Sequence, residues 1–360
     1  MRRPHPIHLA LAAFTMVFLL GASPCGTMGS QIRNNIQQAE RNLRINSAQD
    51  IRRVGQRITS ATKHLDAALQ KHLPALKKGL DHPAATELTP EQEYYLGRTV
   101  CAQILAERFE NRVVAVKGKG REATGSADLH YLQAIANALV PAAERSHLDA
   151  LPPERIPTAL RVAVVPGDAP NAYATPGGFV VVTSGMLSLA ENEDELAAVL
   201  AHELSHVTLA HGLSAIDKAE APLLKRIGRG AEALGTSMGV DLSELTQAFD
   251  KFTGAISAKL TKGYDADYEF AADARAASIL EEAGYDPSAL PRIVDRLGSW
   301  LEANGQKGFG ETHPSPKDRL ARLGEVPVVP GAEGHQRVRE VRFAAHTPKL
   351  VQQGAQLASR

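Results

Sequence analysis

NEDELAAVLAHELSHVTLAHG, at residues 192–212, is the stretch of sequence that decides the fold. Asn192, followed three residues later by Glu195, has the form of a capping box and predicts that a helix begins here and continues to the end of the stretch. His202 and His206 are four residues apart, so this helix carries both imidazoles on one face. The turns on either side of them are apolar, which indicates a buried helix.

Two imidazoles in this arrangement can occupy adjacent corners of a tetrahedral zinc site. Glu203 lies too far round the helix to bind the ion beside both histidines, but its carboxylate can reach a water molecule held by the metal. Zinc lowers the pKa of such a water, and Glu203 would take its proton as general base. Two surface histidines beside a carboxylate would give the same pattern, but the apolar flanks argue against that alternative. We therefore predict one Zn²⁺ per chain at a hydrolytic site.

A site that keeps one position for water needs a third protein ligand. His211 lies nine residues after His202, on the opposite face of a continuous helix, and is expected to be a helix C-terminal residue favoured by the helix dipole. Glu269 is the better candidate, within a helix predicted over residues 265–282. Asp273 lies on the same helical face and can accept the free ring N–H of a ligand histidine. Glu and Asp at this spacing usually form only the solvated face of a helix. The pair becomes a candidate here because the predicted zinc site still needs a third protein ligand.

Cap and turn residues mark further elements along the chain. The segment Thr89-Pro90-Glu91-Gln92 is typical of a helix start and predicts a helix to about Phe109. This helix would carry Cys101 as a small buried residue. Shorter patterns predict a second helix over residues 128–139 and strands over residues 160–165 and 179–183.

Four blocks of the chain, in order, resemble the gluzincin metallopeptidase family that includes HtpX, the CAAX prenyl proteases and BepA. The resemblance extends over about residues 89–323 and implies a zincin-like domain. The chain shows neither the several membrane spans of HtpX and the prenyl proteases nor the tetratricopeptide region of BepA, so we expect a soluble, periplasmic BepA-like member. The blocks are NAYATPGG at residues 171–178, residues 193–212, YEFAAD at residues 268–273 with GYDP at 284–287, and THPSP at residues 312–316 with Arg319.

The same resemblance implies roles for residues whose function the surrounding sequence does not determine. In the family, the segment that corresponds to Asn171, Ala172 and Tyr173 forms, with the next strand, the sheet edge along which an extended substrate pairs. His313 and Arg319 resemble a histidine and an arginine that approach the metal from a late loop, beside the substrate or blocking it. The alternatives for these two are a structural loop histidine and a salt-bridged arginine.

The N-terminus has the composition of a secretory signal. Two arginines precede the apolar run Leu9–Ala22, and small residues follow it. We predict a signal peptide over residues 1–25, a periplasmic protein, and no transmembrane span in the mature chain. The alternative is a protease anchored in the membrane by the retained apolar run. Lipid attachment at Cys25 is disfavoured, because a proline and not a small residue precedes it.

Lys and Arg together number 40, as do Asp and Glu, so no charge excess points to nucleic acid as a partner. We predict an α+β fold, mostly helical, with a small β-sheet over the active-site helix. The expected function is a zinc endopeptidase that clears misfolded or misassembled envelope proteins, with outer-membrane assembly machinery as a further partner. A chaperone or adaptor with a latent zinc site is the alternative, and an intact Glu203 argues against it. The expected segments are a signal peptide (1–25), a helical N-terminal region (26–88), a metallopeptidase domain (89–325) and a C-terminal tail (326–360).

Overall fold

The computed structural model divides the chain, by its internal contacts, into Met1–Arg57 and Ile58–Arg360. All residues whose structure is described belong to the second unit. The predictions for residues 1–87, which include the signal peptide and the N-terminal helical region, lie outside the described residues, as does the prediction for His313. The described residues are 88–110, 112–114, 127–145, 156–216, 242–305, 314–324 and 333–359.

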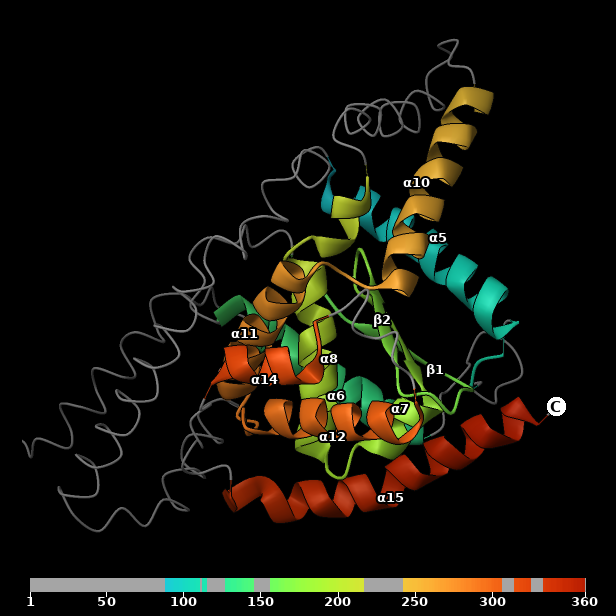
Figure 1. The fold of residues 1–360 in the computed structure, drawn as a ribbon. Coiled ribbons are helices and arrows are strands. Elements are labelled where there is room, and N and C mark those ends of the chain that lie inside the picture. The colour runs from blue at the N-terminus through green and yellow to red at the C-terminus, as the bar shows by residue number, and fades with distance from the viewer. Residues whose placement is uncertain are drawn as a thin grey trace, which may run out of the picture. The chain divides into compact units, whose positions relative to one another are not determined.

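This part of the chain is mostly helical and holds one small sheet, which confirms the predicted α+β fold (Figure 1). Among the described residues, no helix is both long and apolar enough to cross a membrane. The helices predicted over residues 90–109 and 265–282 are confirmed. The helices are α5 (Pro90–Phe109), α6 (Ala127–Arg145), α7 (Ser184–Leu189), α8 (Glu193–Thr208), the 3-10 helix η2 (His211–Ala215), α10 (Leu242–Lys262), α11 (Ala266–Glu282), α12 (Ala289–Ala303), α14 (Pro316–Leu323) and α15 (Glu333–Ala358); the strands are β1 (Arg161–Val165), β2 (Ala172–Thr175) and β3 (Phe179–Thr183).

The sheet has the strand order β1-β3-β2, so β2 lies at one edge. β3 pairs in parallel with β1 and antiparallel with β2. The strand predicted over residues 179–183 is confirmed, and the one predicted over residues 160–165 begins one residue later, at Arg161. The turn between β2 and β3 passes through Gly177 and Gly178, whose φ values of 73° and 88° favour glycine. This turn makes β2 an antiparallel edge strand next to the central helix.

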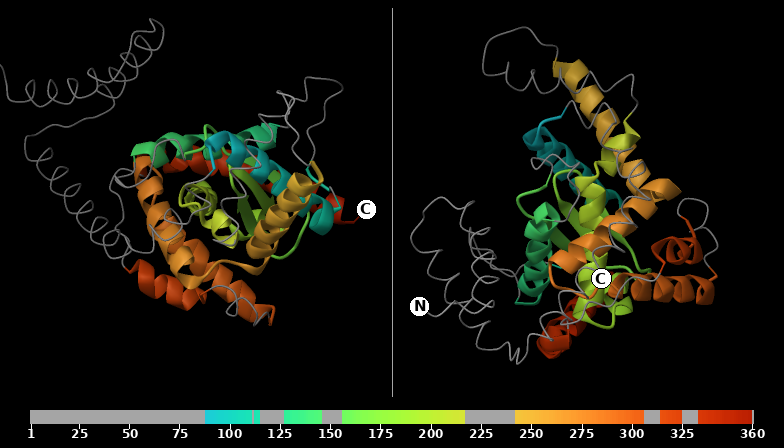
Figure 2. Two further views of the ribbon diagram at one scale, coloured as in Figure 1. Left: turned by 90° about the horizontal axis from the view of Figure 1, so that it is seen from above. Right: turned by 90° about the vertical axis from the view of Figure 1, so that its left-hand side faces the viewer.

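α8 is the central helix, and every one of its residues is buried, as the apolar flanks of its histidines predicted. Figure 2 (left) shows it nearly end-on, with the sheet and other helices around it. Its neighbours are α11, α6, α12, α15 and β2. A helix covered on all sides must be apolar all round or have its polar groups met by partners. The polar side chains at its start must therefore have partners.

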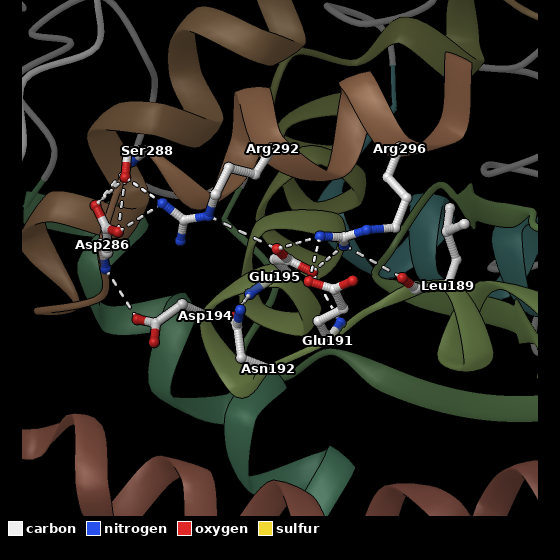
Figure 3. Close-up of polar contacts among 9 residues, drawn as sticks. All are labelled: Leu189, Glu191, Asn192, Asp194, Glu195, Asp286, Ser288, Arg292 and Arg296. Atoms are coloured by element: carbon white, nitrogen blue, oxygen red, sulfur yellow. Dashed lines mark hydrogen bonds and ion pairs between the residues drawn. The ribbon is translucent and has the colours of Figure 1, made fainter. Parts of the chain in front are cut away.

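The start of α8 is held by a cap and by arginines of α12 (Figure 3). Asn192 accepts the backbone N–H of Glu195 at 3.0 Å, which confirms the predicted cap. The Glu195 carboxylate accepts the backbone N–H of Glu191 at 2.8 Å, not that of the cap residue as in a regular capping box. Arg296 pairs with Glu195 and Glu191, and Arg292 Nε lies 3.7 Å from Glu195 Oε1. These contacts fasten α12 across the start of α8.

Residues 333–358 form the helix α15, where the sequence analysis predicted a tail. α15 packs against α7, α6 and α8. Arg339 Nη1 lies 2.6 Å from Asp194 Oδ1, and Arg342 Nε donates to Glu193 Oε2 at 3.0 Å. Both carboxylates are buried at the start of α8. α15 also packs apolar side chains onto the core through Leu350, Phe343 and Leu357, while Val338 and Val341 are exposed.

α6 continues through Pro141 to Arg145, six residues beyond its predicted end. Proline lacks a backbone N–H and usually ends or kinks a helix. The extra turn persists because Ala142 and Ala143 are buried, and because the Ala143 carbonyl accepts a hydrogen bond from Arg275 of α11 at 3.2 Å. Packing against α11 therefore outweighs the hydrogen bond that the proline removes.

We predict that Gly97→Ala destabilises the fold, because α5 approaches the β2–β3 turn closely at this position. A Cβ at Gly97 would lie 1.6 Å from the carbonyl oxygen of Pro176, and backbone atoms cannot move aside cheaply. We expect a loss of about 1–3 kcal/mol in the free energy of unfolding, measured by urea denaturation. Gly254→Ala in α10 is the matched control: its Cβ meets nothing within 4 Å, so it should be neutral or stabilise. Equal losses in both variants would contradict the close approach.

We predict that Arg339→Met lowers the free energy of unfolding by about 3 kcal/mol, because it leaves Asp194 buried without its ion-pair partner. Arg337→Met is the matched control, since Arg337 lies on the same helix but is exposed. Urea denaturation of both variants gives the comparison. A loosely attached C-terminal segment would make the two substitutions equally harmless.

Candidate active site

The three residues predicted to bind a metal converge at the contact between α8 and α11. His202 and His206 come from α8 and Glu269 from α11, and all three are buried. The two Nε2 atoms lie 3.0 Å apart, and each lies 3.5 Å from an oxygen of the Glu269 carboxylate. Among the described residues, this is the one group of His, Cys, Asp and Glu side chains whose ligand atoms all lie within 4.8 Å of one another.

These donors fit a tetrahedral divalent cation. Ligand atoms that are each about 2.1 Å from such an ion lie about 3.4 Å from one another, close to the three separations found here. His202 donates its Nδ1–H to Asp273 Oδ1 at 2.9 Å, so a metal would bind this ring through Nε2, after that nitrogen has lost its proton. Burial and the charge of Arg319 lower the pKa of His202, but hydrogen bonds to Asp273 and Glu269 outweigh them and raise it to about 9. The surroundings thus favour positive charge at this point.

Arg319 reaches the same centre from α14, a helix, where the resemblance implied a late loop. It forms a bidentate ion pair with Asp273, with Nε at 2.8 Å from Oδ2 and Nη2 at 2.6 Å from Oδ1. Burial alone would raise the pKa of Asp273, but Arg319 and the hydrogen bond from His202 lower it, so the carboxylate stays ionised. Arg319 Nη1 also lies 3.9 Å from Glu269 Oε2. The arginine is salt-bridged, as one alternative held, and it also lines the cleft.

A cleft beside the convergent donors is lined by residues of β2, α8, α11, α12 and α14. Glu203 belongs to this lining, next to His202 and His206. The carboxylate predicted to act as base therefore faces the same space as the atoms predicted to bind the metal. Much of the remaining lining is apolar and comes from Met186, Val199, Leu290, Ile293, Val294 and Leu297.

The three residues expected to bind substrate lie at the start of the edge strand β2, and all three line the cleft. Asn171 donates from Nδ2 to the Tyr173 hydroxyl at 2.9 Å, and its Oδ1 accepts the backbone N–H of Ala172 at 2.8 Å. These bonds hold the strand start in an extended shape. The Tyr173 ring is buried in a small cluster with Cys101, so most of its surface is committed to packing. Cys101 is buried, as predicted.

The position of His211 differs from the one predicted from the sequence. The helix was predicted to continue to Gly212, which would turn His211 away from the ligands, but α8 ends at Thr208 and Ala210 adopts a left-handed conformation with φ 57°. His211 Nδ1 consequently lies 2.8 Å from His206 Nδ1. Burial lowers the pKa of His211 to about 3, so it is not a charged residue at a helix end. A helical wheel could not find this contact because it assumes an unbroken helix.

Comparison with known proteins matches residues 128–326 to peptidase family M48. The chain is 30% identical over 166 residues to the mitochondrial metalloendopeptidase OMA1 of Schizosaccharomyces pombe, covering 45% of each protein. It is 29% identical over 170 residues to the beta-barrel assembly-enhancing protease of Escherichia coli, covering 46% of this chain and 34% of the relative. It is 32% identical over 155 residues to the E. coli metalloprotease YcaL, covering 42% of this chain and 56% of the relative.

These matches span only about a third to just over half of the relatives' lengths. They therefore show similarity in the aligned domain only. The family match is broader, since residues 128–326 are more than half of the chain and contain α8, α11 and α14. The protein therefore belongs to peptidase family M48.

Proposed function

We propose that the protein is a zinc endopeptidase of the periplasm that degrades misfolded or misassembled envelope proteins. The observation that carries this proposal is the convergence of two imidazole nitrogens and a carboxylate beside a second carboxylate in one cleft. His202, His206 and Glu269 would hold the ion. A zinc ion bound there supplies the Lewis acidity that lowers the pKa of water and polarises a carbonyl group.

The chain's own residues would then move the proton and hold the ligands in place. Glu203 would take a proton from the attacking water and pass it to the nitrogen of the leaving amine. Asp273 would hold the His202 ring in one orientation, and Arg319 would keep Asp273 ionised. The charge of Arg319, which lines the cleft, would also stabilise negative charge that develops on the substrate carbonyl oxygen.

His313 is proposed, on the family resemblance alone, to approach the same centre. Its imidazole would either donate to the developing oxyanion or occupy the position that water otherwise takes. These two roles have opposite effects on activity at rest, so removal of the side chain would slow the enzyme in the first case and activate it in the second.

The cleft is suited to extended segments with apolar side chains. Among the described strands, none pairs with the outer edge of β2, so backbone groups there can pair with a substrate with little regard to its sequence. The apolar side chains of α12 line the same cleft. Unfolded proteins expose both extended backbone and apolar side chains, whereas folded proteins bury them. The beta-barrel assembly-enhancing proteases among the relatives extend the proposal to outer-membrane assembly machinery as a partner.

We predict that Glu203→Gln lowers kcat/KM for unfolded casein by about 10²–10⁴-fold, because the amide cannot accept the proton of the attacking water. The bound zinc, measured by atomic emission, should be unchanged, since Glu203 is not among the ligands. Glu302→Gln, an exposed change on α12, is the matched control and should retain full activity. Equal casein cleavage by all three proteins, or none by any, would support the alternative of a chaperone or adaptor with a latent metal site.

We also propose that residues 1–25 are a signal peptide. In cells that express the full chain, we expect the protein in the periplasmic fraction, with a mature N-terminus near residue 26 found by N-terminal sequencing. Recovery in the membrane fraction with residues 9–22 retained would contradict this proposal and identify a membrane anchor. An acyl group on Cys25, found by mass spectrometry, would instead identify a lipoprotein.

A further inference from the structure

The turn that follows the end of α8 brings two histidine side chains into contact. α8 ends at Thr208, Ala210 takes a left-handed backbone conformation, and the 3-10 helix η2 begins at His211. A left-handed conformation costs an alanine roughly 1–2 kcal/mol, so it persists only where surrounding contacts require it. Here Ala210 is buried, and the turn brings the imidazole of His211 onto that of His206.

The contact between these two rings is a hydrogen bond between nitrogens. His206 Nδ1 and His211 Nδ1 lie 2.8 Å apart, and the ring planes meet at 70°. The Nε2 atom of His206 faces His202 and Glu269, so it is the atom that would bind a metal. A neutral imidazole that binds metal through Nε2 carries its proton on Nδ1. His206 would therefore donate, and His211 Nδ1 would accept.

The surroundings of His211 suit a neutral acceptor. Its side chain is fully buried, and burial disfavours the charged form of an imidazole. The Tyr268 ring lies against it at 4.4 Å between centroids, and the Tyr264 ring stacks on His206 at 4.3 Å. Among the described residues, His211 Nε2 has no hydrogen-bond partner, so the bond to His206 is the polar contact that its ring makes. The two tyrosines restrict how either imidazole can turn.

The two ligand histidines are thus oriented by different chemistry. His202 donates to an ionised carboxylate, Asp273, which an arginine holds in place. His206 faces the neutral imidazole of His211, and the Tyr264 ring stacks on it. Residues that orient a ligand histidine usually change metal affinity by 10–100-fold when they are removed.

We propose that His211 is a positioning residue for the metal centre: it accepts the Nδ1–H of His206 and thereby fixes the tautomer and orientation in which His206 Nε2 points at the metal. The proposal rests on the zinc site of the proposed function. In this role His211 contacts the ligand histidine His206 and not the substrate.

Zinc affinity measured by competition with a chromophoric chelator tests this role. His211→Leu should weaken zinc binding by about 10–100-fold and change the visible absorption of the cobalt-substituted protein. In His211→Asn, the side-chain oxygen takes the place of Nδ1, so much of the affinity and the spectrum should return. Ile216→Ala, which removes buried packing just after the same 3-10 helix, is the matched control. It should lower the melting temperature and leave zinc affinity unchanged.

The outcomes separate this proposal from the one on which it rests. Wild type that binds no zinc would defeat the proposed function itself. Wild type that binds zinc, with His211→Leu binding equally well and giving the same cobalt spectrum, would overturn the role of His211 alone. Equal losses of affinity in His211→Leu, His211→Asn and Ile216→Ala would do the same, because they would reflect stability only.

A measurement on the unaltered protein covers the case in which His211→Leu does not fold. In zinc-loaded protein with ¹⁵N-labelled histidines, we expect the proton of His206 on Nδ1 and a coupling across the hydrogen bond to His211 Nδ1. A His206 proton on Nε2, or no coupling between the two nitrogens, would overturn the proposal.

Discussion

Burial of α8 on all sides is the constraint on which the rest of the structure depends, because this helix carries groups that are costly to remove from water. The carboxylates at its start are met by arginines from α12 and α15. The imidazoles near its end are met by carboxylates from α11 and by a histidine from η2. The surrounding helices are therefore placed by the charges of α8 as well as by apolar packing.

α11 has the largest part in this arrangement because it contributes both a proposed metal ligand and the carboxylate proposed to orient another ligand. Glu269 and Asp273 lie one turn apart and face different atoms of the α8 histidines. Arg275, on the same helix and fully buried, donates from Nε to the Thr208 hydroxyl at 2.8 Å. This bond fixes the end of α8 against α11. A single pair of helices thus sets the spacing and orientation of the three proposed ligands.

The features that the sequence predicted well are those that local geometry determines. The cap at Asn192 and the four-residue spacings of the histidines and of Glu269 with Asp273 follow from the pitch of one helix. The features that it missed depend on residues far apart in the chain. Arg296 meets Glu195 across 101 residues, α6 passes Pro141 because α11 packs there, and His211 reaches His206 only because α8 stops early. No pattern within a single element carries such information, and the chemical roles of the cleft residues remain proposals.

The position of α15 at the far end of these elements bears on how the domain assembles. Arg339 follows Asp194 by 145 residues, and contacts between residues so far apart in sequence form slowly during folding. Before they form, the carboxylates at the start of α8 lack their arginine partners from α15, and the burial of α8 is incomplete. The order of elements along the chain thus makes the enclosure of the central helix depend on contacts with residues 333–358, far from it in sequence.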